Sequence, residues 1–156
     1  MVILIVAIIS SMAMPVYNYL KKFAQNAACV ANLRGLFYGL HSYTQDHDRV
    51  WPQQPDSLDA EQDVSNWWFT ALQPYINQQK SWICPSDFLQ EQMRKQPNPP
   101  FISSYHVTPF DEVPDIAYTW YQPWAVEKYE NHGKAHGPNM LMPDGAVKAG
   151  VSLLGN

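Results

Sequence analysis

The chain opens on a stretch without a charged side chain, and the first charge is Lys21. Residues 1–14 read MVILIVAIISSMAM, and counting on to Leu20 gives about 20 residues, or roughly 30 Å of helix. This length matches a bilayer core and predicts a membrane-spanning helix over residues 1–20. Two other interpretations stay open. In the first, the run is a signal peptide, with residues 10–13 as a weak small-residue cleavage site. In the second, it is a helix buried in a protein core.

Helical character continues past this run and becomes one-sided. Apolar residues recur at steps of three and four, at Leu20, Phe23, Ala27, Val30, Leu33, Phe37 and Leu40. Pro15 removes one backbone donor and is expected to kink the helix. The pattern predicts one helix over residues 1–44, with a transmembrane or assembly segment at 1–20 and an amphipathic segment at 21–44.

Residues 45–156 are expected to form an α+β globular domain. After a polar, proline-marked loop at 45–60, short helices are predicted over 63–77, capped by Ser65 or Asn66, and over 88–93, capped by Ser86. Strands are predicted over 101–107 and 116–121, and a hairpin over 139–149 around Asp144-Gly145. Pro143 suggests a turn wider than two residues. The predicted fold is a long N-terminal α-helix, with its first half in a membrane, packed on a small antiparallel β-sheet.

Composition excludes several classes of protein. The net charge is −4 and no basic cluster occurs, so a nucleic-acid partner is not expected. Two cysteines exclude a disulfide-dense scaffold and a four-cysteine zinc site. Cys29 and Cys84 either form a disulfide in an oxidising compartment or are two small buried residues that never meet.

Several segments carry a family resemblance, in order, along nearly the whole chain. They are the apolar run ending in Met14-Pro15-Val16-Tyr17, the block Cys29-Val30-Ala31-Asn32-Leu33-Arg34, Tyr43 with Asp46 to Asp48 and Trp51-Pro52, Cys84-Pro85-Ser86-Asp87, Ser104-Tyr105, and Asn139 to Val147. Together the chain resembles the bacterial type IV pilins and type II secretion pseudopilins, in particular prepilin-type proteins with a C-terminal His…Asp-Gly motif.

The resemblance implies a structural subunit, not an enzyme, of a pilus-like or type II secretion filament. Such a subunit is expected to sit in the bacterial inner membrane as a single-pass protein, with its C-terminal domain extracytoplasmic. The implied partners are the lipid bilayer, identical or homologous pilin-like subunits, and the secretion or pilus assembly machinery. The residues expected to mediate membrane insertion and assembly are Val2, Ile5, Ile8, Ile9 and Pro15.

The chain also departs from the family pattern. The basic leader, its glycine and the early glutamate do not appear, so by the register of Pro15 the chain is expected to begin inside the mature N-terminus. Lys21 and Lys22 follow the apolar run, which conflicts with the positive-inside rule unless a basic leader precedes it. Lys134 occupies the position of the expected histidine, with His132 and His136 on either side.

No cofactor is expected, although four residues are weak candidates for holding calcium or zinc: Glu130, His132, His136 and Asp144. The alternative for these residues is a solvated loop. Catalytic residues are not expected, because Ser103, Ser104, His106 and Asp111 lack a nucleophile-elbow motif and Cys84 with His106 is equally unspecific. A secreted hydrolase whose signal sequence is residues 1–14 is the third functional hypothesis.

The second functional hypothesis is a membrane-tethered, extracytoplasmic module that binds a glycan or a protein through a Trp-rich face. The segment Tyr118 to Trp124 supplies the candidate partner surface, with Tyr118, Trp120 and Trp124. The alternative is that a small domain fills its core with large rings. We expect Trp68 and Trp82 in the core and leave Trp124 open.

Overall fold

The computed structural model describes residues 2–119, 121–129, 131–132 and 137–150, and the side chains within these ranges except those of residues 2–13 and Pro15. The elements are α1 (Val2–Asp46), α2 (Glu61–Leu72), the 3-10 turn η1 (Gln79–Trp82), α3 (Phe88–Met93), β1 (Tyr105–Val107), α4 (Ile116–Thr119), β2 (Ala125–Glu127), β3 (Asn139–Leu141) and β4 (Val147–Ala149). The α+β class and the long N-terminal helix are confirmed.

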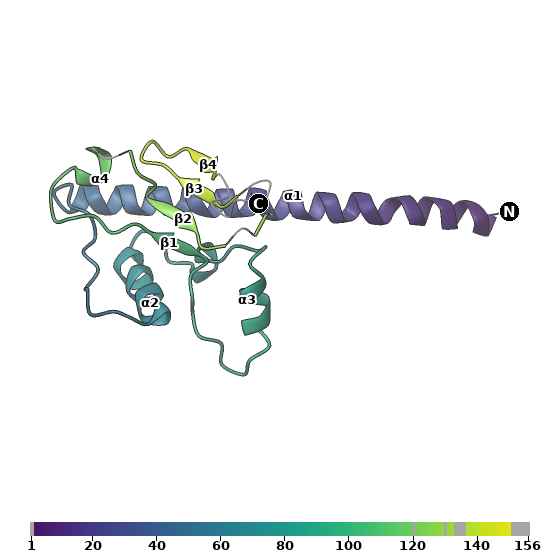
Figure 1. The fold of residues 1–156 in the computed structure, drawn as a ribbon, viewed down its shortest axis with the longest axis horizontal. Helices are drawn as coiled ribbons and strands as arrows, with labels where there is room; N and C mark the ends of the chain where they lie inside the picture. Colours follow the sequence, from purple (N-terminus) through teal and green to yellow (C-terminus); the bar gives the residue numbers. More distant parts are fainter. Residues whose placement is uncertain (1, 120, 130, 133–136, 151–156) are drawn as a thin grey trace, which may run out of the picture.

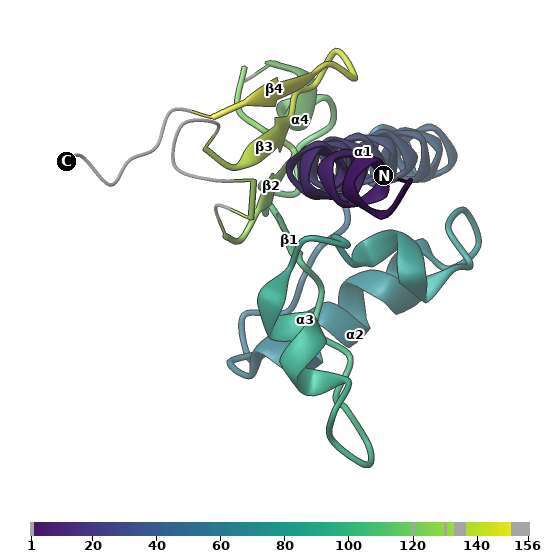
Figure 2. The same ribbon diagram turned by 90° about the vertical axis from the view of Figure 1, so that its right-hand side faces the viewer.

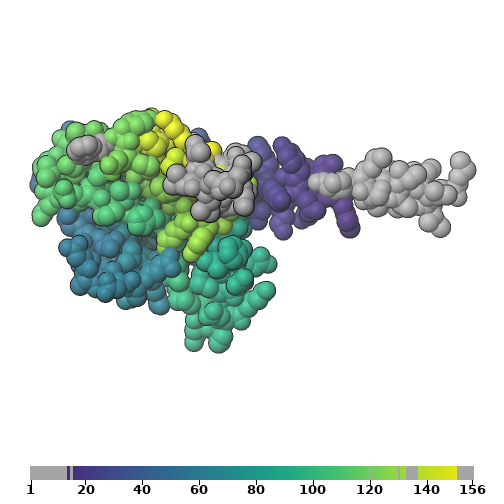
Figure 3. All heavy atoms as spheres, in the orientation of Figure 1, coloured from purple at the N-terminus to yellow at the C-terminus, as the bar shows by residue number. Residues whose placement is uncertain are grey.

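Helix α1 extends well beyond the rest of the molecule on its N-terminal side (Figure 1), and in Figure 3 its described purple atoms stand clear of the domain. Each described side chain from Met14 to Ala24 is exposed, and Gln25 is the first partly buried one. We call residues 14–24 the free segment of α1. The helix therefore has two environments, since only its second half contacts the domain.

The packed half of α1 buries one stripe at helical spacing. Its members are fully buried at steps of four, three and four: Cys29, Leu33, Leu36 and Leu40. The predicted stripe is correct at Leu33 and Leu40. Its first members, Leu20 and Phe23, are 57% and 65% exposed.

No helix among the residues that the structure describes is long and apolar enough to cross a membrane. The prediction of a single-pass inner-membrane anchor over residues 1–20, and of a membrane-embedded first half of the fold, is therefore wrong. The count of 20 included Tyr17, Asn18 and Tyr19, whereas a spanning helix needs about 20 predominantly apolar residues.

The C-terminus of α1 is closed by a left-handed turn. Asp48 has a φ of 52°, and the amide of Arg49 donates to the carbonyl oxygen of Thr44 at 2.7 Å. A residue in this conformation followed by such a six-to-one bond is the Schellman arrangement, which satisfies a free carbonyl at a helix end. The chain then turns back, and Trp51 is buried in the core.

Within the described part of the chain, four short strands form one antiparallel sheet in the order β1-β2-β3-β4. Figure 2 looks along α1 and shows β3 and β4 on one side of the helix and α2 with α3 on the other. Side chains alternate between the two faces of a strand, so the inward positions form rows across the sheet. Val107, Ala125 and Leu141 form an apolar row, and Tyr105 and Glu127 begin a polar row beside it.

The predicted strand over residues 116–121 is wrong, because Ile116–Thr119 forms the short helix α4. Asp115 takes a φ of 64°, and its carbonyl oxygen accepts from the amides of Tyr118 and Thr119. This turn directs Tyr118 back toward α1. The second strand comes instead at Ala125–Glu127, where three residues were too few to show an alternating pattern.

Both predicted helix caps are also wrong. Helix α2 begins after Ala60 without a side-chain cap, and the hydroxyl of Ser65 donates to the carbonyl oxygen of Glu61 inside the helix. Helix α3 is capped by Asp87, whose Oδ1 accepts from the amide of Leu89 at 3.0 Å. Ser86 lies one residue too early for this role.

The hairpin over residues 139–149 is confirmed, with the wider turn that Pro143 suggested. The amide of Gly145 donates to the carbonyl oxygen of Met142 at 2.9 Å, and Gly145 has a φ of 78°. Proline at the second position and glycine in the left-handed position fit a three-residue loop built on a type I turn.

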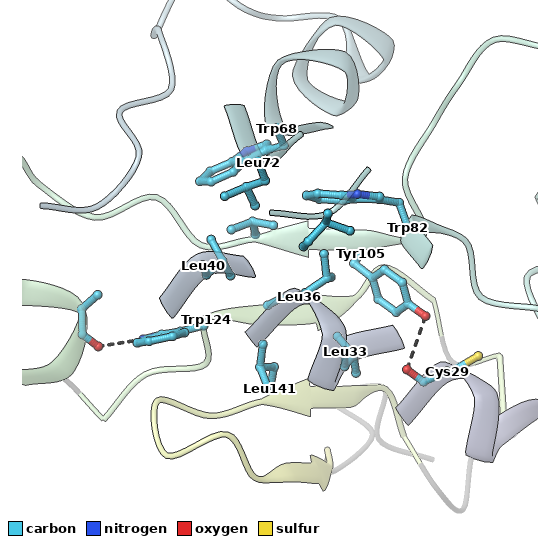
Figure 4. Packing of buried hydrophobic residues seen from close by; sticks show 14 of the residues in the cluster. Cys29, Leu33, Leu36, Leu40, Trp68, Leu72, Trp82, Tyr105, Trp124 and Leu141 are labelled. Carbon is cyan, nitrogen blue, oxygen red and sulfur yellow. Dashed lines mark hydrogen bonds between the residues drawn. The ribbon is translucent and has the colours of Figure 1, made fainter. Parts of the chain in front are cut away.

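The core lies between the packed half of α1 and the two layers beside it. Figure 4 shows the leucines of α1 with Trp68, Leu72 and Trp82 on one side and Leu141 on the other. The placement of Trp68 and Trp82 in the core is confirmed, since they are 3% and 0% exposed. Trp124 is also fully buried, and its indole nitrogen donates to the carbonyl oxygen of Ala117 at 2.8 Å.

Candidate functional site

The free segment of α1 presents a broad face of exposed apolar side chains. Six large ones are between 57% and 75% exposed: Met14, Val16, Tyr17, Tyr19, Leu20 and Phe23. At about 100° per residue, five of these positions, from Val16 to Phe23, fall within an arc of about 160°, with Met14 outside it. Asn18, Lys21 and Lys22 occupy the opposite side of the helix. A contiguous apolar surface often marks an interaction site, whereas a single exposed apolar residue is normal.

A cavity of about 670 Å³ lies where the free segment meets the domain. Tyr19, Lys22 and Phe23 line it from α1, and Phe88 and Glu91 line it from α3. The cavity is thus bounded by aromatic rings and by charges of both signs. His132 also lines the cavity and connects it to a buried polar cluster.

The buried cluster is formed by the two cysteines, Glu127 and His132. Cys29 of α1 and Cys84, which follows η1, form a disulfide bond with a Cα–Cα distance of 5.1 Å. The Nε2 atom of His132 lies 3.7 Å from Sγ of Cys84 and 3.2 Å from Oε1 of Glu127. The four potential ligand atoms all lie within 4.8 Å of one another.

Strand β3 holds the carboxylate of the cluster in place. The side chain of Glu127 is fully buried, and its Oε2 accepts from the amide of Asn139 at 2.9 Å. The Nδ2 of Asn139 donates to Oε1 of Glu127 at 3.1 Å and to Oδ1 of Asn26 on α1 at 2.9 Å. Glu127 therefore has fixed partners from the sheet, which hold its oxygens toward His132.

Tyr105 closes the cluster from β1. Burial raises the pKa of its phenol, so the hydroxyl stays protonated and donates to the carbonyl oxygen of Cys29 at 3.5 Å. The contact is drawn as a dashed line in Figure 4. The polar row of the sheet thus lies directly beside the disulfide.

The four predicted metal candidates are not brought together in the described structure. Glu130 and His136 lie outside the described residues, so their prediction stays open. Asp144 stands in the hairpin turn, where its Oδ1 accepts from the amide of Ala146 at 2.9 Å. His132 is the one candidate that joins the described cluster, with partners that the sequence spacing did not indicate.

The predicted partner surface is wrong at Trp124, which is fully buried. Tyr118 is half-buried, and its hydroxyl lies 2.8 Å from Oγ1 of Thr44 and 3.0 Å from Nδ1 of His41. Trp120 lies outside the described residues. The other buried tryptophans are Trp51, Trp68 and Trp82, so the described rings do not make a Trp-rich face.

The serines and the cysteine of the hydrolase hypothesis form structural hydrogen bonds or the disulfide bond. Ser104 donates to Oδ2 of Asp87 at 2.7 Å, and Ser103 donates to the carbonyl oxygen of Tyr105 at 2.9 Å. The sulfur of Cys84 is in the disulfide bond. Neither serine is hydrogen-bonded to His106 among the described contacts.

The side chains of the predicted assembly residues, Val2, Ile5, Ile8, Ile9 and Pro15, lie outside the described part of the structure. The exposed side chains from Met14 to Leu20 belong to the predicted assembly segment at 1–20, whereas Phe23 belongs to the predicted amphipathic segment.

No protein-family model, curated protein or solved structure matches this chain. The function of the chain must therefore be inferred from the geometry of the free segment and of the buried cluster.

Proposed function

We propose that the chain is a pilin-like structural subunit that assembles with copies of itself through the free segment of α1. The observation that carries the proposal is the broad face of exposed, large apolar side chains on this segment. Exposed apolar area is unfavourable in water, and an apolar helix face is stabilised when neighbouring elements cover it. The family resemblance also supports this proposal, since the segments that carry it occur in the same order along the chain as in the family.

The number of neighbours follows from the shape of the surface. Burying six side chains of this size would contribute on the order of 10 kcal/mol. Association costs about 4–15 kcal/mol, so the burial is of the size that assembly needs. The main apolar face spans an arc of about 160°, wider than the stripe of roughly 100° on a typical packed helix, so a single partner helix would leave part of it exposed. A bundle of several copies is therefore favoured over a two-chain complex.

The distribution of charge favours copies that are staggered along the axis. The basic residues of α1 are Lys21, Lys22 and Arg34, and the first acidic residue of the chain is Asp46. All 14 acidic residues lie from Asp46 onward, so the rest of the chain is strongly negative. A staggered neighbour would bring its acidic domain toward Lys21 and Lys22, which complementary potentials favour.

The proposal is tested by the assembly state of the full chain. Sedimentation and negative-stain electron microscopy without detergent should show concentration-dependent, elongated assemblies of the wild type. A double variant, Leu20→Gln with Phe23→Gln, should shift the chain toward the monomer, because it places two amides in the surface to be buried. Tyr38→Gln is the matched control, since Tyr38 is exposed on the same helix but outside the free segment.

A wild-type chain that stays monomeric at high concentration would overturn the proposal. So would equal assembly of the wild type and the double variant, because contacts elsewhere would then carry the association. Amorphous aggregates without elongated particles would count against a filament subunit. The proposal assigns no catalytic role to any residue.

A further inference from the structure

We propose that Cys29, Cys84, Glu127 and His132 form a redox-gated zinc site, which holds the metal when the disulfide between the two cysteines is reduced. The inference does not rest on the assembly of the chain. It starts from the observation that a buried histidine and a buried carboxylate lie directly against a disulfide. A disulfide needs neither group for its own formation.

The donor types fit zinc better than calcium. Two thiolates, one imidazole nitrogen and one carboxylate oxygen make a four-ligand set that tetrahedral zinc accepts. Calcium prefers six to eight oxygen ligands, and the described cluster offers one carboxylate. The cluster therefore selects a borderline-soft cation such as zinc.

The distances also fit a tetrahedral site. Zinc bonds of about 2.3 Å to sulfur and about 2.0–2.1 Å to nitrogen place sulfur and nitrogen roughly 3.6 Å apart at a tetrahedral angle. Sγ of Cys84 and Nε2 of His132 are 3.7 Å apart. Nε2 of His132 and Oε1 of Glu127 are 3.2 Å apart, near the roughly 3.4 Å expected for nitrogen and oxygen ligands. His132 thus already stands near tetrahedral spacing from both Cys84 and Glu127.

The partners that orient the ligands remain when the metal binds. Oε2 of Glu127 keeps its bond from the amide of Asn139 while Oε1 turns from His132 to the metal. Asn139 is in turn held by Asn26 of α1, the same helix that carries Cys29. Such outer partners fix the orientation of metal ligands in proteins. The cavity beside α1 and α3, which His132 lines, supplies a path from solvent.

The chemistry balances with a dithiol as the reductant. The dithiol gives two electrons and two protons, the bond between the cysteine sulfurs breaks, two thiols form, and the dithiol becomes a disulfide. On binding Zn²⁺, each thiol releases its proton to solvent and its sulfur moves to the metal. His132 binds through Nε2 as the neutral imidazole with its proton on Nδ1, and Glu127 binds as the carboxylate.

The test uses the full chain with Co²⁺ as a spectroscopic probe and Zn²⁺ as its competitor. The reduced wild type should bind one Co²⁺ per chain with a thiolate-to-metal charge-transfer band, and Zn²⁺ should remove that band. The oxidised wild type should show no such band. His132→Ala and Glu127→Gln should each weaken binding by about tenfold or more. His106→Ala and Glu91→Gln are the matched controls and should bind as the wild type does.

Three results would overturn the proposal. The first is a reduced wild type that binds no more Co²⁺ than the double variant Cys29→Ala with Cys84→Ala. The second is unchanged affinity in both His132→Ala and Glu127→Gln, because the cysteines would then bind metal alone. The third is a reduced chain whose far-ultraviolet circular dichroism shows unfolding that Zn²⁺ does not reverse. A second supporting readout is zinc-dependent protection of both thiols from alkylation in the reduced wild type.

Discussion

Gly39 of α1 and Ile76 are so close that a Cβ atom on Gly39 would lie 2.2 Å from Cδ1 of Ile76. Both residues are buried, and Ile76 belongs to the hydrophobic core. Replacement Gly39→Ala therefore forces the isoleucine or the helix to move. We expect it to lower the free energy of unfolding by about 1–3 kcal/mol, as overpacking of a core does. Urea denaturation followed by tryptophan fluorescence measures the change.

Gly35 provides the control for this prediction. It lies on the same helix, one turn earlier, and a Cβ there would meet nothing within 4 Å. Gly35→Ala should raise the free energy of unfolding by about 0.5–1 kcal/mol, because alanine is the better helix former. Equal effects of the two replacements would contradict the close packing of α1 against Ile76.

Asp87 connects the start of α3 to β1. Its Oδ1 caps the helix through the amide of Leu89, and its Oδ2 accepts from the buried hydroxyl of Ser104. Asp87→Ala should lower the free energy of unfolding by about 2–4 kcal/mol, since it removes a cap and leaves a buried donor without its acceptor. Ser86→Ala should change it by less than about 0.5 kcal/mol. A larger loss at Ser86, measured by chemical denaturation, would restore Ser86 as the cap.

The hydroxyl of Tyr118 bonds within the molecule, with Thr44 and His41 of α1. Tyr118→Phe should lower the free energy of unfolding by about 0.5–1.5 kcal/mol. Tyr121→Phe is the matched control and should be nearly neutral, because Tyr121 is 63% exposed and its hydroxyl, among the described residues, bonds only with Nζ of Lys148 at the surface. Thermal unfolding of the two variants measures which replacement lowers the stability more. An effect at Tyr121 equal to that at Tyr118 would argue against the internal role.

The disulfide between Cys29 and Cys84 closes a loop with a sequence separation of 55 residues. Loop-closure entropy predicts that the double variant Cys29→Ala with Cys84→Ala loses about 4 kcal/mol of stability. Either single replacement should lose about as much, because one missing sulfur already breaks the bond. A loss below about 1 kcal/mol in guanidinium denaturation of the oxidised proteins would show that the bond constrains the unfolded chain little.

The features that the sequence predicted correctly are those with a local signal. The long helix follows from its spacing and from the lack of a stop signal before residue 43, and the hairpin follows from Asp144-Gly145 beside Pro143. The segment Ile116 to Tyr121 was misjudged because strand propensity in six residues was weaker than the turn at Asp115. Tyr118 of this segment also contacts Thr44 and His41 of α1, and no local sequence pattern reports such tertiary contacts.

The candidate site was only partly accessible to sequence reasoning. The pairing of Cys29 with Cys84 was one of two alternatives, since two cysteines do not show whether they meet. The approach of His132 and Glu127 to this pair depends on the register between β2 and β3 and on the place of α1 over the sheet. Those relations join residues far apart in the chain. Spacing along the sequence therefore pointed to Glu130 and His136 instead.

The place of Cys29 on α1 has a mechanical consequence. It lies only a few residues after the free segment ends and ahead of Leu33, Leu36 and Leu40. A pull on the N-terminal end along the helix axis therefore reaches the covalent link to Cys84 before it loads the leucine contacts. Tension in an assembly of such chains would be carried by the covalent disulfide bond. The leucine contacts that follow it along α1 would then bear less shear.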